Sequence, residues 1–360
     1  MDIYELVGEF IDGRLKVLRL AYISAYKWIY EVEPPSVGKT RRGLKVLASP
    51  EARQKGSYDR LHQLATQLKQ IQSPYLERVY ESGQLYDQTP YLLTDWEPHT
   101  SLHEFLRLKR KSLGWGEVKS ILHEVALGLI HLHERGLVHG DLRAQHVLLR
   151  NTDHNAVLTD IGVDNALRSP PSPGLDKSLA YWSPERHTFL QATPAADMYS
   201  YGVLIFFCLE GVLPFQPDLE WCMNQNPPVD PSVAIVELHQ RASPPPFKTN
   251  VPKEVKDMVL RLLAKNPLER PARMSEVIQE LFNDVSHQPS SMNEISDIDV
   301  KLSPESSTIA AASETTPIDV TPPIQTWNQV DTPPSISQSR LFVASTVALI
   351  LGHLLSLLIK

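Results

Sequence analysis

Two short motifs at a fixed separation constrain most strongly what this chain can fold into. The first runs His139-Gly140-Asp141-Leu142-Arg143-Ala144-Gln145-His146 and leads into the apolar stretch Val147-Leu148-Leu149. The second, Asp160-Ile161-Gly162, begins fourteen residues after His146. Phosphoryl transfer needs a group that accepts a hydroxyl proton and an acidic ligand for the metal that neutralises the phosphates. One aspartate in each motif could supply these functions, and the spacing of the first motif is similar to the H-x-D-L-x-x-x-N of a phosphoryl-transfer loop.

Four further segments resemble the motifs of one protein family and follow that family's order along the chain. Leu44-Lys45-Val46-Leu47 resembles the end of V-A-I-K on a strand, and Tyr181-Trp182-Ser183-Pro184-Glu185 resembles A-P-E. Asp197-Met198-Tyr199-Ser200-Tyr201-Gly202 resembles a D-x-W-S-x-G helix, and Arg270 lies in Asn266-Pro267-Leu268-Glu269-Arg270-Pro271. With these motifs the chain resembles the eukaryotic-type (Hanks-type) Ser/Thr protein kinase family, as a degenerate member. The resemblance implies an α+β fold of bilobal protein kinase type, with a small strand-rich N-lobe and a larger helical C-lobe.

The resemblance also implies roles for the polar residues of the motifs. Asp141 would be the catalytic base, Arg143 would steady the transferred phosphate, and Lys45 would hold the α- and β-phosphates. Asp160 would bind the metal, and His146 stands at the position of the second metal ligand.

Further positions are assigned in the same way. Asp95 and Glu97 lie in the expected hinge that binds the nucleotide, with Thr94 at the gatekeeper position. The residues with implied structural roles are His139, Glu185, Asp197 and Arg270, and Arg270 is expected to pair with Glu185.

The nucleotide site departs from the family's pattern first in the loop over the phosphates. Tyr22, Ser24 and Lys27 align where the family has G-x-G-x-x-G. A glycine lets the backbone approach a ligand closely, and none stands at these three positions. We therefore do not expect a backbone phosphate cradle.

Two more departures concern Lys45 and the second metal position. The helix that should supply a glutamate partner for Lys45 offers Gln63 or Leu64, so we expect no ion pair to hold this lysine. His146 replaces an asparagine, and magnesium prefers oxygen ligands to imidazole. The expected cofactors are therefore ATP and Mg²⁺ (or Mn²⁺), weakly bound.

Hydrophobic periodicity places the motifs on secondary structure. One helix is expected around Tyr58 to Gln70 in the N-lobe. Glu117 to Arg135 carries an apolar stripe at helical spacing and ends at Gly136, just before the first motif.

The net charge of the chain argues against nucleic acid as a partner. The 360 residues are 42% hydrophobic and carry a formal net charge of −7. Binding to nucleic acid phosphates needs a basic surface, so we expect no nucleic acid partner. The two cysteines, Cys208 and Cys222, show no pairing pattern and indicate buried thiols in a reducing compartment.

The chain changes character near residue 286. Residues 286–340 are rich in Ser, Thr, Pro, Asp and Glu, which predicts a disordered linker after a kinase-like domain at 1–285 (N-lobe 1–97, C-lobe 98–285). Residues 341–359 are uncharged and almost wholly apolar, and a helix of that length spans ~28 Å, close to the ~30 Å hydrocarbon core. We expect a single-pass C-terminal membrane anchor. The acidic N-terminus has no signal-peptide pattern, so the kinase-like domain should face the cytoplasm.

Two functions remain open from the sequence. The first is a weak or conditional Ser/Thr protein kinase that phosphorylates a protein substrate. The second is a catalytically inactive pseudokinase that acts as a membrane-tethered scaffold for a protein partner. Small-molecule phosphotransferases also carry H-G-D, but they lack the segments seen here at Ser183-Pro184-Glu185 and Asp197 to Gly202.

Overall fold

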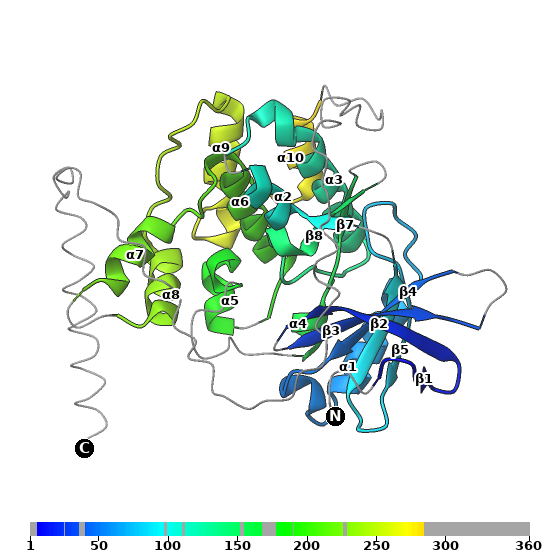
Figure 1. Ribbon diagram of the computed structural model, residues 1–360. Coiled ribbons are helices and arrows are strands. Elements are labelled where there is room, and N and C mark those ends of the chain that lie inside the picture. The colour runs from blue at the N-terminus through cyan, green and yellow to red at the C-terminus, as the bar shows by residue number, and fades with distance from the viewer. Residues whose placement is uncertain are drawn as a thin grey trace, which may run out of the picture. The chain divides into compact units, whose positions relative to one another are not determined.

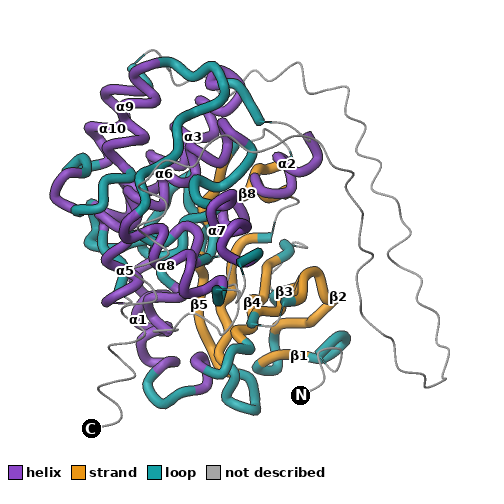
Figure 2. The backbone as a smooth tube through the Cα atoms, turned by 90° about the vertical axis from the view of Figure 1, so that its left-hand side faces the viewer, coloured by secondary structure: helices purple, strands orange, loops and turns teal. Residues whose placement is uncertain are grey.

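The computed structural model describes residues 6–283 except 25, 36–39, 97–98, 110–111, 152–154, 168–177, 190 and 226–228. The described residues form two lobes, one rich in strands and one made mostly of helices (Figures 1 and 2). This arrangement confirms the predicted bilobal fold. The predicted linker at 286–340 and the predicted anchor at 341–359 lie outside the described residues.

The N-lobe is built on an antiparallel sheet. Six of the described strands pair in the order β1-β2-β3-β4-β6-β5. Their bounds are β1 Phe10–Ile11, β2 Leu15–Ile23, β3 Lys27–Glu33, β4 Arg42–Leu47, β5 Val79–Gln84 and β6 Pro90–Asp95. In β4, Leu44 and Val46 are fully buried in the N-lobe core. Successive strand side chains point to opposite faces, so Lys45 between them faces the cleft.

Helix α1 (Ser57–Leu68) packs against β5 and matches the helix expected near residues 58–70. Its buried residues Leu61, Leu64, Ala65 and Leu68 recur at the spacing of one helix face. Gln63 lies on the exposed side of this helix. The face that turns to the rest of the protein is therefore apolar.

The C-lobe surrounds one long buried helix. Thr193 caps the start of α6 (Pro194–Glu210), since its hydroxyl accepts a hydrogen bond from the Ala196 N–H at 3.2 Å, and Gly211 caps the end with φ +72°. A helix that is apolar nearly all round belongs inside a large core, which agrees with the burial of most of α6. The other helices are α2 Leu102–Lys109, α3 Trp115–His133, α4 Val163–Leu167, α5 Pro184–Phe189, α7 Gln216–Met223, α8 Pro231–Arg241, α9 Lys253–Leu262 and α10 Met274–Leu281.

Helix α3 brings the chain to the first motif. The Gly114 N–H donates to Glu117 Oε2 at 2.8 Å and caps the start of the helix. After the helix, Gly136 has φ +69°, a left-handed conformation that glycine adopts without strain. Both features agree with the helix expected at 117–135.

A small sheet positions both motifs. β7 (His99–Ser101), β8 (Val147–Arg150) and β9 (Ala156–Leu158) pair in that order. The first motif ends in the short 3-10 helix η2 (Ala144–His146) directly before β8, and Asp160 comes two residues after β9. The segment after α1 joins this sheet, since the Leu158 N–H donates to Tyr75 O at 2.9 Å and the Glu77 N–H donates to Leu158 O at 2.8 Å.

The two cysteines do not form a disulfide. Cys208 is fully buried and Cys222 is partly buried, and both are free. None of the helices that the structure describes is both long and apolar enough to span a bilayer.

Candidate functional site

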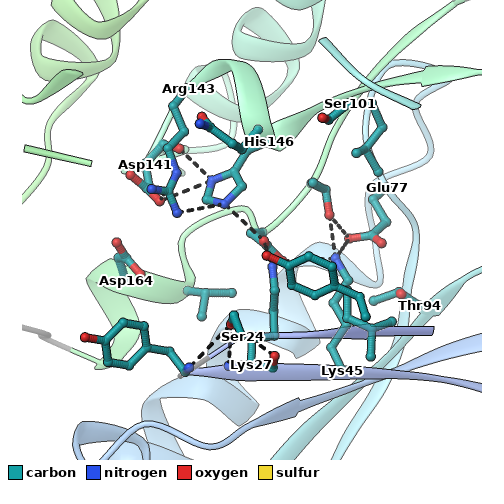
Figure 3. Close-up of a pocket in the computed structure, with 18 of the residues that line it drawn as sticks. Ser24, Lys27, Lys45, Glu77, Thr94, Ser101, Asp141, Arg143, His146 and Asp164 are labelled. Atoms are coloured by element: carbon teal, nitrogen blue, oxygen red, sulfur yellow. Dashed lines mark hydrogen bonds and ion pairs between the residues drawn. The ribbon is translucent and has the colours of Figure 1, made fainter. Parts of the chain in front are cut away.

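A cavity of about 880 Å³ lies between the two lobes and collects most of the residues that the motifs single out (Figure 3). The N-lobe contributes Lys27 from β3 and Lys45 from β4. The C-lobe contributes Asp141 and Asp160 from the two motifs. Side chains more than a hundred residues apart therefore meet in one cleft.

Asp141 is nearly enclosed, with 4% of its surface exposed. Its Oδ2 lies 3.2 Å from Arg143 Nε and 3.2 Å from His146 Nδ1. Burial alone would raise the pKa of Asp141, but the charge of Arg143 and the hydrogen bond from His146 outweigh burial and hold the pKa below its usual range. The carboxylate is thus ionised at neutral pH. Its Oδ1 is buried and has no hydrogen-bond partner among the described residues.

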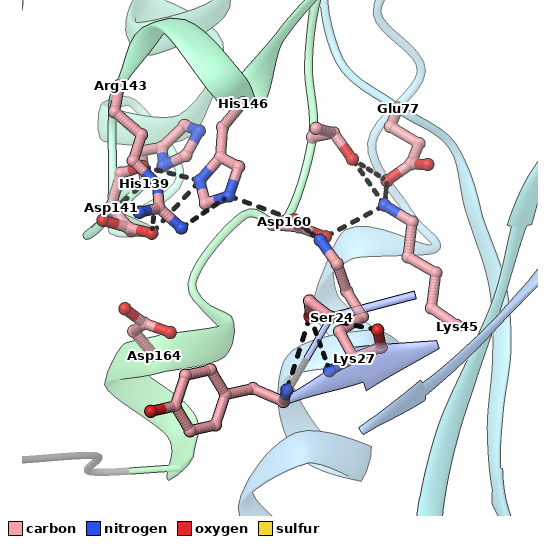
Figure 4. A network of polar contacts seen from close by, with 12 residues as sticks. Ser24, Lys27, Lys45, Glu77, His139, Asp141, Arg143, His146, Asp160 and Asp164 are labelled. Carbon is pink, nitrogen blue, oxygen red and sulfur yellow. Dashed lines mark hydrogen bonds and ion pairs between the residues drawn. The ribbon is translucent and has the colours of Figure 1, made fainter. Parts of the chain in front are cut away.

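His146 bridges the two aspartates of the motifs (Figure 4). Its Nδ1 lies 2.9 Å from the Asp141 carbonyl oxygen, an acceptor only, so Nδ1 carries a proton. Its Nε2 lies 3.2 Å from an Arg143 amino group, a donor only, and 3.3 Å from Asp160 Oδ2. Both ring nitrogens therefore have partners within the protein, and neither is left to ligate a metal.

Asp160 receives positive charge on both carboxylate oxygens. Oδ1 lies 3.0 Å from Lys45 Nζ, and Oδ2 pairs with Lys27 Nζ. Burial alone would raise the pKa of Asp160, but Lys27 and Lys45 lower it well below its usual range. Asp160 also has φ +59°, a left-handed conformation that is uncommon outside glycine. Such strain persists at functional sites where the surroundings impose it.

Lys45 corrects one expectation, because an ion pair does hold it. Its ammonium lies 2.6 Å from Glu77 Oε2, and it also donates to Thr159 Oγ1 and to Asp160. Burial lowers the pKa of Lys45, but the charges of Asp160 and Glu77 outweigh this and raise it. The prediction that α1 supplies no glutamate is correct.

Sequence reasoning missed Glu77 as the partner of Lys45. Its segment pairs with the strand end before Thr159, which brings the carboxylate to the lysine from outside the helix. The Thr159 hydroxyl donates to Glu77 Oε2 at 2.7 Å and fixes it further. The sequence carried only a weak signal for this partner, because Glu77 stands next to Arg78 in a segment of mixed polarity before β5.

The expected hinge is only partly described. Thr94 is 1% exposed, and Asp95 lines the cavity. Asp95 Oδ1 accepts a hydrogen bond from the Tyr80 hydroxyl at 2.7 Å. Glu97, the other predicted nucleotide-binding residue of the hinge, lies outside the described residues.

Asp197, one of the residues with a predicted structural role, holds the backbone of the first motif. Asp197 Oδ2 accepts from the His139 N–H at 2.8 Å, and its Oδ1 accepts from the Gly140 N–H at 2.9 Å. His133 Nε2 lies 2.9 Å from the same carboxylate. Burial lowers the pKa of His139 to about 4, so this ring is neutral at physiological pH. The Asp197 carboxylate thus fixes the backbone that leads into Asp141.

Arg270 and Glu185 form the predicted ion pair. Arg270 Nη1 donates to Glu185 Oε1 at 2.7 Å, and Nη2 donates to Oε2 at 2.9 Å. Such a two-pronged pair is stronger and more directional than a single contact. It ties α5 to the segment before α10.

Comparison with known proteins agrees with this geometry. A family model of the protein kinase domain matches residues 41–283. The serine/threonine-protein kinase PrkC of Bacillus subtilis is 25% identical over 273 residues, covering 74% of this chain and 39% of PrkC. The serine/threonine-protein kinase PknA of Mycobacterium tuberculosis is 26% identical over 275 residues, covering 73% of this chain and 59% of PknA. The chain therefore spans less than two thirds of either relative.

A solved structure shares the fold. The crystal structure of the Mycobacterium tuberculosis PknI kinase domain aligns with a TM-score of 0.58 at 22% identity, covering 76% of this chain and 96% of that one. At this level of identity the likeness concerns the fold alone.

Proposed function

This chain belongs to the protein kinase family, and from that membership we propose that it transfers the γ-phosphoryl group of ATP to serine or threonine hydroxyls of a protein. The transfer breaks the bond between the γ-phosphorus and the oxygen that bridges to the β-phosphate. A new bond forms to the hydroxyl oxygen, ADP leaves with the electron pair, and the hydroxyl proton passes to Asp141.

The observation that carries this proposal is the free oxygen of Asp141. The carboxylate lines the cavity, and the buried Oδ1 has no partner in the described part of the chain. A buried acceptor without a hydrogen-bond partner costs free energy, and a catalytic role is one reason for a protein to keep such an atom. A substrate hydroxyl would satisfy it and would deliver its proton there.

Arg143 serves this base in two ways. Its Nε lies 3.2 Å from Asp141 Oδ2, so it orients the carboxylate and keeps it ionised. It also lines the cavity, where a guanidinium can contact a phosphoryl group. Both effects favour a transition state in which negative charge sits between the nucleotide and the hydroxyl.

Protein kinase domains in general use ATP with a divalent metal ion, but the donors here do not fit such an ion well. Both oxygens of Asp160 are paired with lysine ammonium groups, and both nitrogens of His146 have partners. Magnesium prefers oxygen ligands in a near-octahedral arrangement. We therefore propose weak nucleotide binding to which the metal adds little, and slow or conditional catalysis.

Replacing His146 with asparagine tests this account of slow transfer. Asparagine supplies an amide oxygen in place of the imidazole, so we expect the transfer rate to rise by about tenfold and to depend more steeply on Mg²⁺. The measurement is phosphate incorporation from labelled ATP into a generic protein substrate over a range of Mg²⁺ concentrations.

His62→Asn makes the same change on the exposed side of α1 and serves as the control, with no expected effect. A His146→Asn rate equal to that of the wild type would show that the imidazole does not limit transfer.

A pseudokinase scaffold is the second candidate. The ion pairs of Lys27 and Lys45 with Asp160 favour it, because they satisfy the second aspartate without any ligand. Under this alternative, neither the wild type nor His146→Asn would transfer phosphate in Mg²⁺ or Mn²⁺. The protein would then act only by binding a protein partner.

We also propose that residues 341–359 anchor the protein in a membrane, with the kinase-like domain on the cytoplasmic side. The support is the uncharged apolar sequence between Arg340 and Lys360, which has the length of a membrane-spanning helix. Arg340 on the side of the linker agrees with the excess of positive charge in cytoplasmic segments.

Deleting residues 341–360 should move the protein from the membrane fraction to the soluble fraction. The thermal unfolding midpoint of the kinase-like domain should stay unchanged, because few contacts are expected to cross the linker. Replacing 286–340 with a Gly/Ser linker of equal length is the control and should leave the protein in the membrane fraction. A truncated protein that stays with the membranes would contradict the anchor.

A further inference from the structure

The hydrogen-bonding capacity of Lys45 is already used within the protein. A lysine ammonium has three N–H donors. Lys45 Nζ donates to Glu77 Oε2, Thr159 Oγ1 and Asp160 Oδ1, and only 5% of its side chain is exposed. A phosphate oxygen could reach this ammonium only by displacing one of these partners. Lys45 is therefore a poor candidate for the direct phosphate contact that its position implies.

Lys27 has the properties that Lys45 lacks. Within the described residues its ammonium has one acceptor, Asp160 Oδ2, which leaves two of its three donors. Its side chain is 20% exposed and lines the cavity. Figure 4 shows Lys27 reaching Asp160 from the start of β3, where it contacts Oδ2 while Lys45 contacts Oδ1.

The turn before β3 fixes the direction of Lys27. The Ser24 N–H donates to Lys27 O at 2.9 Å, and the Lys27 N–H donates to Ser24 Oγ at 3.0 Å. The ring of Tyr22 lies 5.9 Å from the ammonium, within range of a cation–π contact. These are the three residues that stand where a glycine-rich loop was expected. The side chains at this turn therefore present a cation in place of a backbone cradle.

We propose that Lys27 is the lysine that contacts the nucleotide phosphates, and that its ammonium, held on Asp160, takes the place of the divalent metal ion. This inference rests on the proposed nucleotide site. The two free donors of Lys27 bind phosphate oxygens, while Asp160 keeps the ammonium in position. Lys45 acts as a positioning residue that holds Asp160 by its other carboxylate oxygen, Oδ1.

The positive charges around Asp160 explain why ATP could bind here without a divalent ion. A bound metal normally screens the phosphates from the metal-binding aspartate. Here Lys27 and Lys45 together bring two positive charges to Asp160. ATP binding should therefore not require Mg²⁺.

Titrations of ATP and of adenosine into the intact chain, each with Mg²⁺ or with EDTA, test this proposal. The variants are Lys27→Met, Lys27→Arg and the control Lys16→Met, which removes an exposed lysine of β2. For the wild type we expect the ATP dissociation constant to change by less than about threefold between the two conditions.

Lys27→Met should weaken ATP binding in EDTA by about 10- to 100-fold, the loss of a charge-assisted contact. Mg²⁺ should restore part of that loss, because the substitution removes the ammonium group from Asp160 Oδ2. Lys27→Arg and Lys16→Met should bind ATP nearly as the wild type does. Adenosine has no phosphates, so its binding should be the same in every variant and should show that each one is folded.

Three results would overturn the proposal, and they differ in what they imply. Wild-type binding that needs Mg²⁺ would refute the metal-free site and leave the nucleotide site standing. Undiminished ATP binding by Lys27→Met in EDTA would refute the role of Lys27. Failure of the wild type to bind ATP in either condition would refute both this inference and the proposed function.

Discussion

Replacing Asp141 with asparagine is expected to reduce phosphoryl transfer to a protein substrate by about 10²- to 10⁴-fold. The amide keeps the shape of the side chain, but it cannot accept the hydroxyl proton through an ionised oxygen. The wild-type carboxylate is ionised at neutral pH because Arg143 and His146 hold its pKa low. Initial rates of phosphate incorporation at saturating ATP measure the effect.

Asp257→Asn is the matched control for this experiment. It makes the same chemical change at an exposed position on α9, where Asp257 pairs with Lys253. We expect its transfer rate to equal that of the wild type. ATP affinity should also survive Asp141→Asn, since Asp141 acts on the hydroxyl. An Asp141→Asn rate within a factor of three of the wild type would rule out Asp141 as the base.

The second large effect concerns stability. Glu185→Gln should lower the free energy of unfolding by about 3–5 kcal/mol, because it leaves the Arg270 guanidinium buried without its counter-ion. The Arg270 side chain is fully buried in the structure, while the Glu185 side chain is 17% exposed. Denaturant unfolding of the wild-type and variant proteins at neutral pH measures this loss.

An exposed pair and a change of pH provide the controls. Arg261 and Glu280 make a similar contact at 2.8 Å but are about half exposed, so Glu280→Gln should cost about 0.5 kcal/mol. Burial raises the pKa of Glu185, but its hydrogen bonds and ion pair with Arg270 outweigh burial and lower it. A lowered pKa contributes stability that is complete above the unfolded value, about 4.3, and is lost as the pH falls through the folded value. The gap between wild type and Glu185→Gln should therefore narrow below about pH 4, and a gap that stays constant would contradict the ion-pair account.

Local motifs made much of the fold predictable. Asp141, Asp160 and Lys45 each lie in a short segment whose pattern can be read without knowing the rest of the chain. The apolar stripe after Glu117 and the glycine at 136 predicted helix α3 and its end for the same reason. The ion pair of Arg270 with Glu185 was predictable only through the resemblance, since 85 residues separate the two.

Contacts between distant segments were not predictable from local patterns. Glu77 reaches Lys45 because its segment pairs with the end of β9, and nothing near Lys45 in the sequence signals this. From the sequence, Lys27 was noted only as a position at which the family's glycine-rich loop has a glycine. Its contact with Asp160 depends on a turn in the N-lobe facing a loop 133 residues later. In both cases the charge came from a position that the family's pattern does not use.

Mass spectrometry of a protein substrate incubated with the intact chain and ATP tests the proposed phosphoryl transfer most directly. The reactions contain Mg²⁺, Mn²⁺ or EDTA, and ATP binding is measured in the same buffers. We predict slow formation of phosphoserine or phosphothreonine that disappears with Asp141→Asn. Bound ATP without any phosphorylated residue in all three buffers would contradict the proposed transfer and would leave the protein as a nucleotide-binding scaffold.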